Sequence, residues 1–316
     1  MLSLVLLNMV ALVAAIFFAG ISLLKGKDRF VVPYASILPI SIYLFLVYGT
    51  TMPALVMVLS IISTKFLYSR LFFLFGIFIL GISIVMEILQ VSQEIWRIYD
   101  LSIGIGISLA LITDKQSLNY VKLNDQSKGA NRGKELKRDV IQILAGLVLL
   151  VILYSIGQNN SRVAISIVVI LLYMIGNYYS LFPDTRIGKT LAYFERPTTP
   201  LGMGAIWFAA GMMIAFGIVH SLPILVFIVF VTTIGDPLAT LFGSTIKSPK
   251  LPYNRKKSLA GFMGMFVSSA IFGYALMGFL GVGLSFISAI VESLSLHPLD
   301  DNFALPAVIG VISLFV

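Results

Sequence analysis

Long apolar segments recur along almost the whole chain and constrain its fold more than any other feature. The first runs from Leu2 to Leu24 without a charged residue. A helix crosses the hydrocarbon core of a bilayer with about 20 apolar residues, and backbone in lipid must satisfy its own hydrogen bonds, as a helix does. With 59% hydrophobic residues, 11% charged residues and a mean hydropathy of +1.00, the chain is predicted to be an all-α, polytopic integral membrane protein.

The apolar segments predict about ten to twelve transmembrane helices. The third, the fifth and the last two are short, which leaves the number open within that range. The expected helices lie near residues 2–24, 30–49, 51–63, 71–90, 98–113, 139–157, 163–182, 201–219, 222–243, 259–279, 282–296 and 303–316.

Basic residues are distributed unequally between the two sides of this topology. If the N-terminus faces outward and the segments alternate, the inner loops hold 20 of the 22 Lys and Arg residues, and only Arg97 and Arg162 lie outside. The positive-inside rule then places these loops in the cytosol. Because topology accounts for the net charge of +8, we expect no nucleic-acid partner.

A polar, basic stretch divides the chain into two parts. Residues 114–137 are rich in Asn, Gln, Ser, Lys and Gly and are predicted to form a flexible cytosolic linker. It would separate an N-terminal membrane part, residues 1–113, from a seven-helix membrane domain, residues 138–316. The chain has no Cys and two His, which excludes disulfides, thiolate catalysis and Cys- or His-rich metal sites, so any metal is expected on oxygen ligands.

The segment from Val231 to Gly261 combines a lone acid with a cluster of cations. Asp236 lies in an apolar run, where a carboxylate costs several kcal/mol unless it is paired, hydrated or metal-bound. The cations that follow are Lys247, Lys250, Arg255, Lys256 and Lys257. Together with the small residues Gly235, Gly243 and Gly261, they suit a nucleotide polyphosphate with Mg²⁺. The alternative is that Asp236 caps or kinks a helix before Pro237 and the cations only set topology.

Three further groups of polar residues fall at the same predicted membrane face. Glu135 lies at the start of the first group, and the spacing of Arg138, Gln142 and Gly146 places these three residues on one helical face. The alternative is that Arg138 is an interfacial arginine and Gly146 a glycine that packs against another helix. Glu195 and Arg196 precede an expected helix, where the acid would also be favoured by the helix dipole. The third group is Glu292 followed by Asp300, Asp301 and Asn302, which would either coordinate Mg²⁺ or, through Asn302, cap a helix.

These blocks, in this order, resemble the CTP-dependent polyprenol kinase family, which includes dolichol, phytol and farnesol kinases and CTP-dependent diacylglycerol kinases. The resemblance covers residues 135–316. Its blocks are E-x-x-R at Glu135 to Arg138 with Gly146, E-R at Glu195 and Arg196, G-D-x-x-A-x-x-x-G at Gly235 to Gly243, K-S-x-x-G at Lys257, Ser258 and Gly261, and Glu292 with D-D-N at Asp300 to Asn302. Two positions depart from the family, since Gln142 stands where His is frequent and Ala260 where an acid is frequent.

The resemblance implies transfer of the γ-phosphoryl group of CTP to a lipid alcohol at the cytosolic membrane face. Asp236, Asp301 and Asn302 would bind Mg²⁺, and Asp300 or Asp301 would bind metal or orient the alcohol. Lys257, Arg138 and Arg196 would contact phosphate, with Glu195 orienting Arg196. The remaining nucleotide-binding positions would be Gly235, Gly243, Ser258 and Gly261, with Glu135, Gln142 and Glu292 as supporting residues. The membrane would be the plasma membrane of a prokaryote or the endoplasmic reticulum, and the alcohol and oligomeric state stay open.

Two other functions remain alternatives. A phosphatidate cytidylyltransferase-like enzyme would also use CTP and Mg²⁺ but would release pyrophosphate. A secondary transporter would carry ionisable groups near the bilayer midplane, whereas most of those in this chain fall at one face. Residues 1–113 lie outside the kinase resemblance; Glu87, Gln90, Arg97 and Asp100 faintly resemble VanZ-like domains at the outer face, and an architectural role is expected for this part.

Overall fold

A computed structural model describes residues 92–112, 132–156, 203–294 and 300–316 continuously, together with isolated positions between 56 and 90 and between 164 and 189. For residues 132–138 it describes the backbone alone. Several predictions therefore lie outside the described residues: the site residues Glu195 and Arg196, the side chains of Glu135 and Arg138, Glu87, and all or part of the predicted helices before residue 92 and at 163–182.

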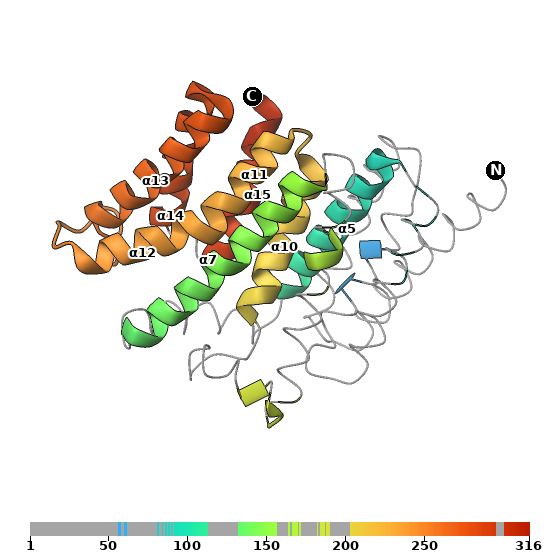
Figure 1. Cartoon of the computed structure of the whole chain (residues 1–316), viewed down its shortest axis with the longest axis horizontal. Coiled ribbons are helices and arrows are strands. Elements are labelled where there is room, and N and C mark those ends of the chain that lie inside the picture. Colours follow the sequence, from blue (N-terminus) through green and yellow to red (C-terminus); the bar gives the residue numbers. More distant parts are fainter. Residues whose placement is uncertain are drawn as a thin grey trace, which may run out of the picture.

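The described parts of the chain are helical (Figure 1). Within them no strand forms, and Lys250 and Ser258 make an isolated antiparallel bridge, so the all-α prediction is confirmed. Three helical stretches are long and apolar enough to cross a membrane: Gln93–Ile112, Leu222–Thr245 and Leu259–Met277. The elements are α5 (Gln93–Ile112), α7 (Arg132–Ser155), α10 (Met203–Ile218), α11 (Leu222–Phe230), the π-helical turn η1 (Val231–Gly235), α12 (Asp236–Thr245), α13 (Leu259–Met277), α14 (Phe279–Leu294), α15 (Asp301–Ile312) and the 3₁₀ turn η2 (Ser313–Phe315).

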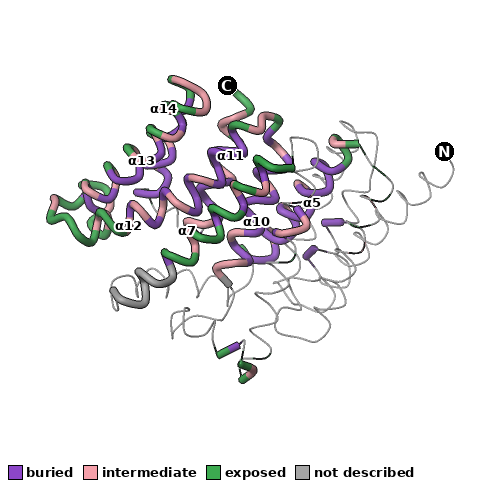
Figure 2. Tube along the Cα trace, in the orientation of Figure 1, coloured by how far each residue is buried: buried purple, intermediate pink, exposed green. Residues whose placement is uncertain are grey.

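Helix α10 forms the centre of the described bundle, packed between α5 and α15. Most of its side chains are buried, as the purple tube in Figure 2 shows, and Trp207 meets Phe303 of α15 edge to face at 5.5 Å. Gly217 abuts Leu101 of α5 and Ile214 abuts Gly104 of α5, whereas Gly211 abuts Phe303 of α15. Since Gly310 of α15 in turn abuts Ala215, α10 runs antiparallel to α5 and parallel to α15. The start of α10 therefore lies beside the start of α15, and the end of α10 beside the end of α15.

One continuous helical stretch, Leu222–Thr245, crosses the bundle next. Its 24 residues span about 36 Å at 1.5 Å per residue, which is enough for the hydrocarbon core. The helix does not break at Asp236. Instead, it widens into η1, where the Asp236 N–H donates to the Val231 carbonyl five residues earlier. The predicted helix at 222–243 is thus confirmed, and Asp236 is the first residue of α12 within it.

Helices α13 and α14 form an antiparallel hairpin on the outside of the bundle (Figure 1). Gly278 ends α13 with φ of 63°, a left-handed backbone conformation that glycine adopts without a steric penalty. Phe272 of α13 stacks on Phe230 with ring centroids 3.9 Å apart. The outward side of α13 is apolar, with Ile271 exposed (Figure 2), as expected for a helix that faces lipid. The hairpin closes so that the start of α13 and the end of α14 lie at the same end.

Helix α7 lies alongside α11, η1 and α12 (Figure 1). It begins at Arg132, so the last six residues of the predicted linker 114–137 are helical. Many of its apolar side chains between Val140 and Tyr154 are exposed, whereas those of Leu149 and Leu153 are buried. The buried side therefore holds α7 against the stretch that contains Asp236.

Candidate active site

A structured loop, residues 246–258, connects α12 to α13. Several backbone hydrogen bonds tie the loop. They include the bonds from the Leu251 N–H to the Lys257 carbonyl at 3.0 Å and from the Leu259 N–H to the Pro249 carbonyl at 2.9 Å. At its tip, Asn254 accepts a hydrogen bond from the Lys256 N–H at 3.1 Å, which is typical of Asn in a tight turn. The loop is therefore a small folded unit in which the direction of each lysine is set by the backbone.

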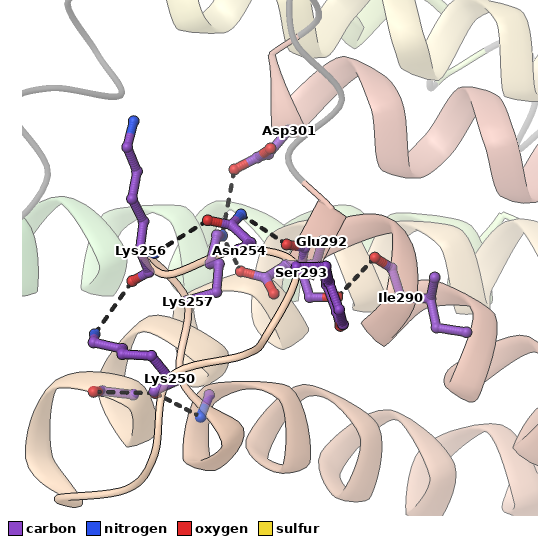
Figure 3. A network of polar contacts seen from close by, with 12 residues as sticks. Lys250, Asn254, Lys256, Lys257, Ile290, Glu292, Ser293 and Asp301 are labelled. Carbon is purple, nitrogen blue, oxygen red and sulfur yellow. Dashed lines mark hydrogen bonds and ion pairs between the residues drawn. The ribbon is translucent and has the colours of Figure 1, made fainter.

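Two loop side chains attach this unit to the end of α14 (Figure 3). The Asn254 amide donates to the Ser293 carbonyl at 2.9 Å, and the Tyr253 hydroxyl lies 2.8 Å from the Ser293 hydroxyl. Because Ser293 follows Glu292, these bonds bring the loop to the residue that Lys257 contacts. No role for Asn254 or Tyr253 in the site was predicted from the sequence. The preference of Asn for tight turns could have indicated Asn254.

Lys257 is the centre of a cluster of carboxyl groups at this end of the bundle (Figure 3). Its ammonium donates to Glu292, a buried residue near the end of α14, and lies 3.6 Å from Asp301 in the first turn of α15. Asp236, on α12, is close enough to act on the charge of Lys257. The structure thus brings together four of the predicted site residues, contributed by α12, the loop, α14 and α15.

The electrostatics of this cluster keep Lys257 charged. Burial by itself would lower the pKa of the Lys257 ammonium, but Glu292, then Asp301 and Asp236, raise the pKa above its ordinary value. Glu292 and Asp301 contact the ammonium and Asp236 acts on its charge, so acidic groups are in excess. A site of this composition suits a divalent cation that brings phosphate oxygens as further ligands.

Asp300 and Asn302 have a local structural role at the start of α15. The Asp300 carboxylate accepts hydrogen bonds from the Asn302 N–H at 3.0 Å and from the Asn302 side-chain amide at 2.8 Å. Asp300 is therefore the N-cap of α15, and the alternative prediction that Asn302 caps this helix is wrong. The cap fixes the turn from which the next residue, Asp301, reaches Lys257.

The small residues of the predicted nucleotide-binding blocks pack helices together. A methyl group on Gly243 would lie 3.3 Å from the Gly261 Cα, and one on Gly261 would lie 3.0 Å from the Ala239 carbonyl oxygen. Ser258 caps α13 by accepting from the Gly261 N–H at 3.3 Å, and Gly235 lies against Met265 of α13. The spacing of these residues is thus explained by the close crossing of α12 and α13, of the kind small residues permit between membrane helices.

Two predicted residues of α7 face the π turn. The Gln142 amide donates to the Thr232 carbonyl at 2.9 Å, and a methyl group on Gly146 would lie 2.0 Å from the Thr233 hydroxyl oxygen. The predicted shared face of these two residues is confirmed. The backbone places Arg138 one turn before Gln142 on the same helix.

The cations of the loop do not all join the cluster. Lys250 donates to the Lys256 carbonyl at 3.3 Å, and in Figure 3 the side chain of Lys256 extends away from Glu292. Arg255 is exposed. Of the five predicted cations, Lys257 is the one whose side chain the structure places between the carboxyl groups.

The described residues contain no group of three or more His, Asp or Glu side chains arranged to hold a metal by themselves. Mg²⁺ that arrives with a nucleotide needs only one or two protein carboxylates, because phosphates and water complete its six oxygen ligands. Asp236 and Asp301, which both act on Lys257, fit that requirement.

A second polar cluster lies at the opposite end of the bundle. Arg97 of α5 is buried, contacts Glu94 at 3.1 Å, and donates to the Ile218 carbonyl at the end of α10 at 3.1 Å. It also contacts His220, and Ser166 donates to Asp100 at 2.7 Å. The bonds of Arg97 hold α5 to the end of α10.

The described fold is that of an all-α membrane protein with a lysine–carboxyl cluster at one end of its helices. A stretch of 112 residues is 35% identical to an uncharacterized protein of Methanocaldococcus jannaschii, and covers 35% of this chain and 58% of that protein. Phytol kinase 1, chloroplastic, of Arabidopsis thaliana is 26% identical over 223 residues, 64% of this chain and 70% of the kinase. Probable phytol kinase 1, chloroplastic, of Glycine max is 28% identical over 204 residues, 57% of this chain and 66% of that protein.

No protein-family model matches the chain, and no solved structure matches it. The similarities to the two plant proteins support a distant relationship between this chain and the phytol kinases.

Proposed function

We propose that this protein is a lipid-alcohol kinase that transfers the γ-phosphoryl group of CTP to the hydroxyl of a polyprenol-like or isoprenoid alcohol, or of diacylglycerol. The observation that carries the proposal is the meeting of Lys257, Asp301 and Glu292, with Asp236 nearby, at one end of apolar helices. The distant relationship to phytol kinases supports an isoprenoid alcohol as acceptor.

Phosphoryl transfer depends mainly on positioning and on neutralising charge at the phosphate oxygens. Lys257 would supply a permanent positive charge to a phosphate, held in place by the buried Glu292. Asp236 and Asp301 would hold Mg²⁺, which would neutralise charge on the nucleotide. Asp301 is more exposed than Glu292, with 13% against 4% of its side chain accessible, so it is the carboxylate we assign to the acceptor hydroxyl as well.

The location of the cluster explains how two unlike substrates meet. Lys257, Glu292 and Asp301 lie where α13 begins, α14 ends and α15 begins. We place this end of the helices at the predicted cytosolic face, to which a water-soluble nucleotide would have access. A lipid alcohol places its hydroxyl at the same interface while its chain remains among the apolar helices. Phosphoryl donor and acceptor therefore meet without either one crossing the bilayer.

The direct test uses the purified full chain with γ-labelled CTP, Mg²⁺ and a panel of alcohols: a polyprenol, phytol, geranylgeraniol and diacylglycerol. We expect label in the lipid. Label released as pyrophosphate, with a CDP-lipid as product, would instead establish a cytidylyltransferase. Absence of any CTP-dependent product across the panel would contradict both enzymes.

The first variant to measure is Asp236→Asn, which removes a charge and keeps the side-chain volume. We expect less than about a tenth of the wild-type rate, the equivalent of roughly 1.4 kcal/mol or more in the barrier. The matched control is Glu94→Gln, an exposed acid at the opposite end of the bundle, which should keep the wild-type rate. Equal rates for Asp236→Asn and wild type would remove Asp236 from the mechanism.

A further inference from the structure

The π turn before Asp236 creates a hydrogen-bonding problem in the buried backbone. In η1 the Asp236 N–H donates to the Val231 carbonyl, five residues back instead of four. In that register the next carbonyl, that of Thr232, would receive the N–H of residue 237. Residue 237 is proline, which has no N–H. The π register therefore leaves the Thr232 carbonyl without its main-chain donor.

Thr232 is fully buried, so this carbonyl has no access to water. An unsatisfied buried polar group is costly, and a continuous helix through this point needs a donor from elsewhere. Gln142, on α7, provides it, because its side-chain amide lies 2.9 Å from the Thr232 oxygen. One turn further along α7, Gly146 leaves just enough room for Thr233, so α7 can approach closely enough for that bond.

The π turn also decides where Asp236 points. Each π turn adds one residue to a helix, and one residue of an α-helix corresponds to a rotation of about 100°. An α-helical register through Gly235 would therefore turn the Asp236 side chain by roughly that angle. In the observed register Asp236 acts on the charge of Lys257.

We propose that Gln142 is a positioning residue: it supplies from α7 the hydrogen bond that Pro237 withholds, and so fixes the π turn that sets the direction of the Asp236 side chain. This inference rests on the proposed function for the importance of Asp236 in catalysis. The hydrogen bond itself, and its dependence on Pro237, are independent of that function.

The first experiment measures hydrogen exchange of the purified chain, which requires no substrate. Gln142→Met keeps the length of the side chain and removes the donor. We expect faster exchange of backbone amides in residues 230–240 and unchanged exchange in α14. Leu144→Met, an exposed position on the same helix, is the control and should exchange like wild type. Unchanged exchange in the Gln142 variant would overturn the proposal.

The second experiment tests the role of the proline through a double-variant cycle. Pro237→Ala restores an N–H at residue 237, so the Thr232 carbonyl gains a main-chain partner in either helical register. Gln142→Met should therefore lower the melting temperature clearly in the wild-type background and much less in the Pro237→Ala background. Equal losses in the two backgrounds would show that Gln142 does not replace the proline N–H.

The third experiment connects the bond to catalysis. Gln142→Met should lower kcat about tenfold, the rate equivalent of roughly 1.4 kcal/mol, while the KM for the lipid alcohol stays near the wild-type value. Gln142→Glu can donate to Thr232 only when its carboxyl is protonated, so its rate relative to wild type should fall as pH rises. A pH-independent ratio would contradict donation by residue 142. If wild type has no kinase activity, the proposed function fails, whereas the exchange and stability results still decide the role of Gln142.

Discussion

Lys257 and Glu292 stabilise the fold through each other, and their roles in stability and catalysis can be separated. Because Glu292 is buried, Lys257→Met leaves a carboxylate without its cation, which costs about 3–5 kcal/mol in comparable buried pairs. The double variant Lys257→Met/Glu292→Gln removes both charges, and we expect it to regain most of that stability. Thermal unfolding in detergent measures this, and a double variant less stable than Lys257→Met would contradict the pairing.

The same variants separate structure from chemistry, because the stable double variant should still lack kinase activity. The measurement belongs near neutral pH. The pKa of Lys257 is raised above its unfolded value of 10.5, so its contribution to stability is fully present below that value. That contribution is lost only as pH rises through the still higher folded pKa.

Among single residues, the sequence best predicted which charged side chains come together. An acid or a lysine in an apolar environment requires a partner, and Asp236, Lys257, Glu292 and Asp301 do share one cluster. Sequence could not separate Gly243, Gly261 and Ser258 from ligand contacts, because a small residue serves close helix packing and close ligand approach equally well. Asp300, and not Asn302, is the N-cap of α15. Which of the two residues caps the helix depends on the backbone angles at this turn, and the D-D-N motif does not determine them.

The hairpin of α13 and α14 offers a paired test of close helix packing. A methyl group on Gly281 would lie 2.0 Å from the Gly273 carbonyl oxygen, whereas one on Gly283 would meet nothing within 4 Å. Gly281→Ala should therefore destabilise the protein by about 1–3 kcal/mol, as overpacking does. Gly283→Ala, on the same helix, should be neutral or stabilising by up to about 1 kcal/mol. Melting temperatures of the two variants check this, and equal values would show that the hairpin is not limited by this contact.

Helix positions followed from the apolar segments, and α10, α13 and α15 lie within a few residues of their predicted ranges. The π turn inside Leu222–Thr245 was not predictable in the same way. Its register depends on Pro237 and on a hydrogen bond from Gln142, 90 residues earlier in the chain. Hydrophobic periodicity carries no information about such a contact, and the same holds for the bonds that join Asn254 and Tyr253 to Ser293.

The helical stretch Leu222–Thr245, which is long and apolar enough to cross a membrane, gives a test of the predicted topology. Leu222–Thr245 separates the exposed His220 from the exposed Arg255 in the loop. In this cysteine-free chain, Arg255→Cys should react with an impermeant thiol reagent in inside-out vesicles and not in intact cells. His220→Cys should show the opposite sidedness. Labelling of Arg255→Cys from outside intact cells would contradict the cytosolic site.

The all-α class could be predicted from the sequence, because 59% of the residues are hydrophobic and they are grouped in apolar segments long enough for membrane-spanning helices. The directions of the helices and their neighbours in the bundle could not be predicted from the sequence. Antiparallel α5 and α10, and parallel α10 and α15, follow from which small residues meet which neighbours, and any of the apolar helices could have formed other pairs. The division at residues 114–137 stays a prediction.

The hairpin of α13 and α14 also has a consequence for biosynthesis. Lys257 precedes the first helix of the hairpin and Glu292 lies near the end of the second, so closing the hairpin is enough to bring the two together. Glu292, the most deeply buried acid of the cluster, can thus be paired with its cation before α15 has left the ribosome. Asp301, on α15, joins afterwards, so a segment synthesised later than the hairpin completes the site.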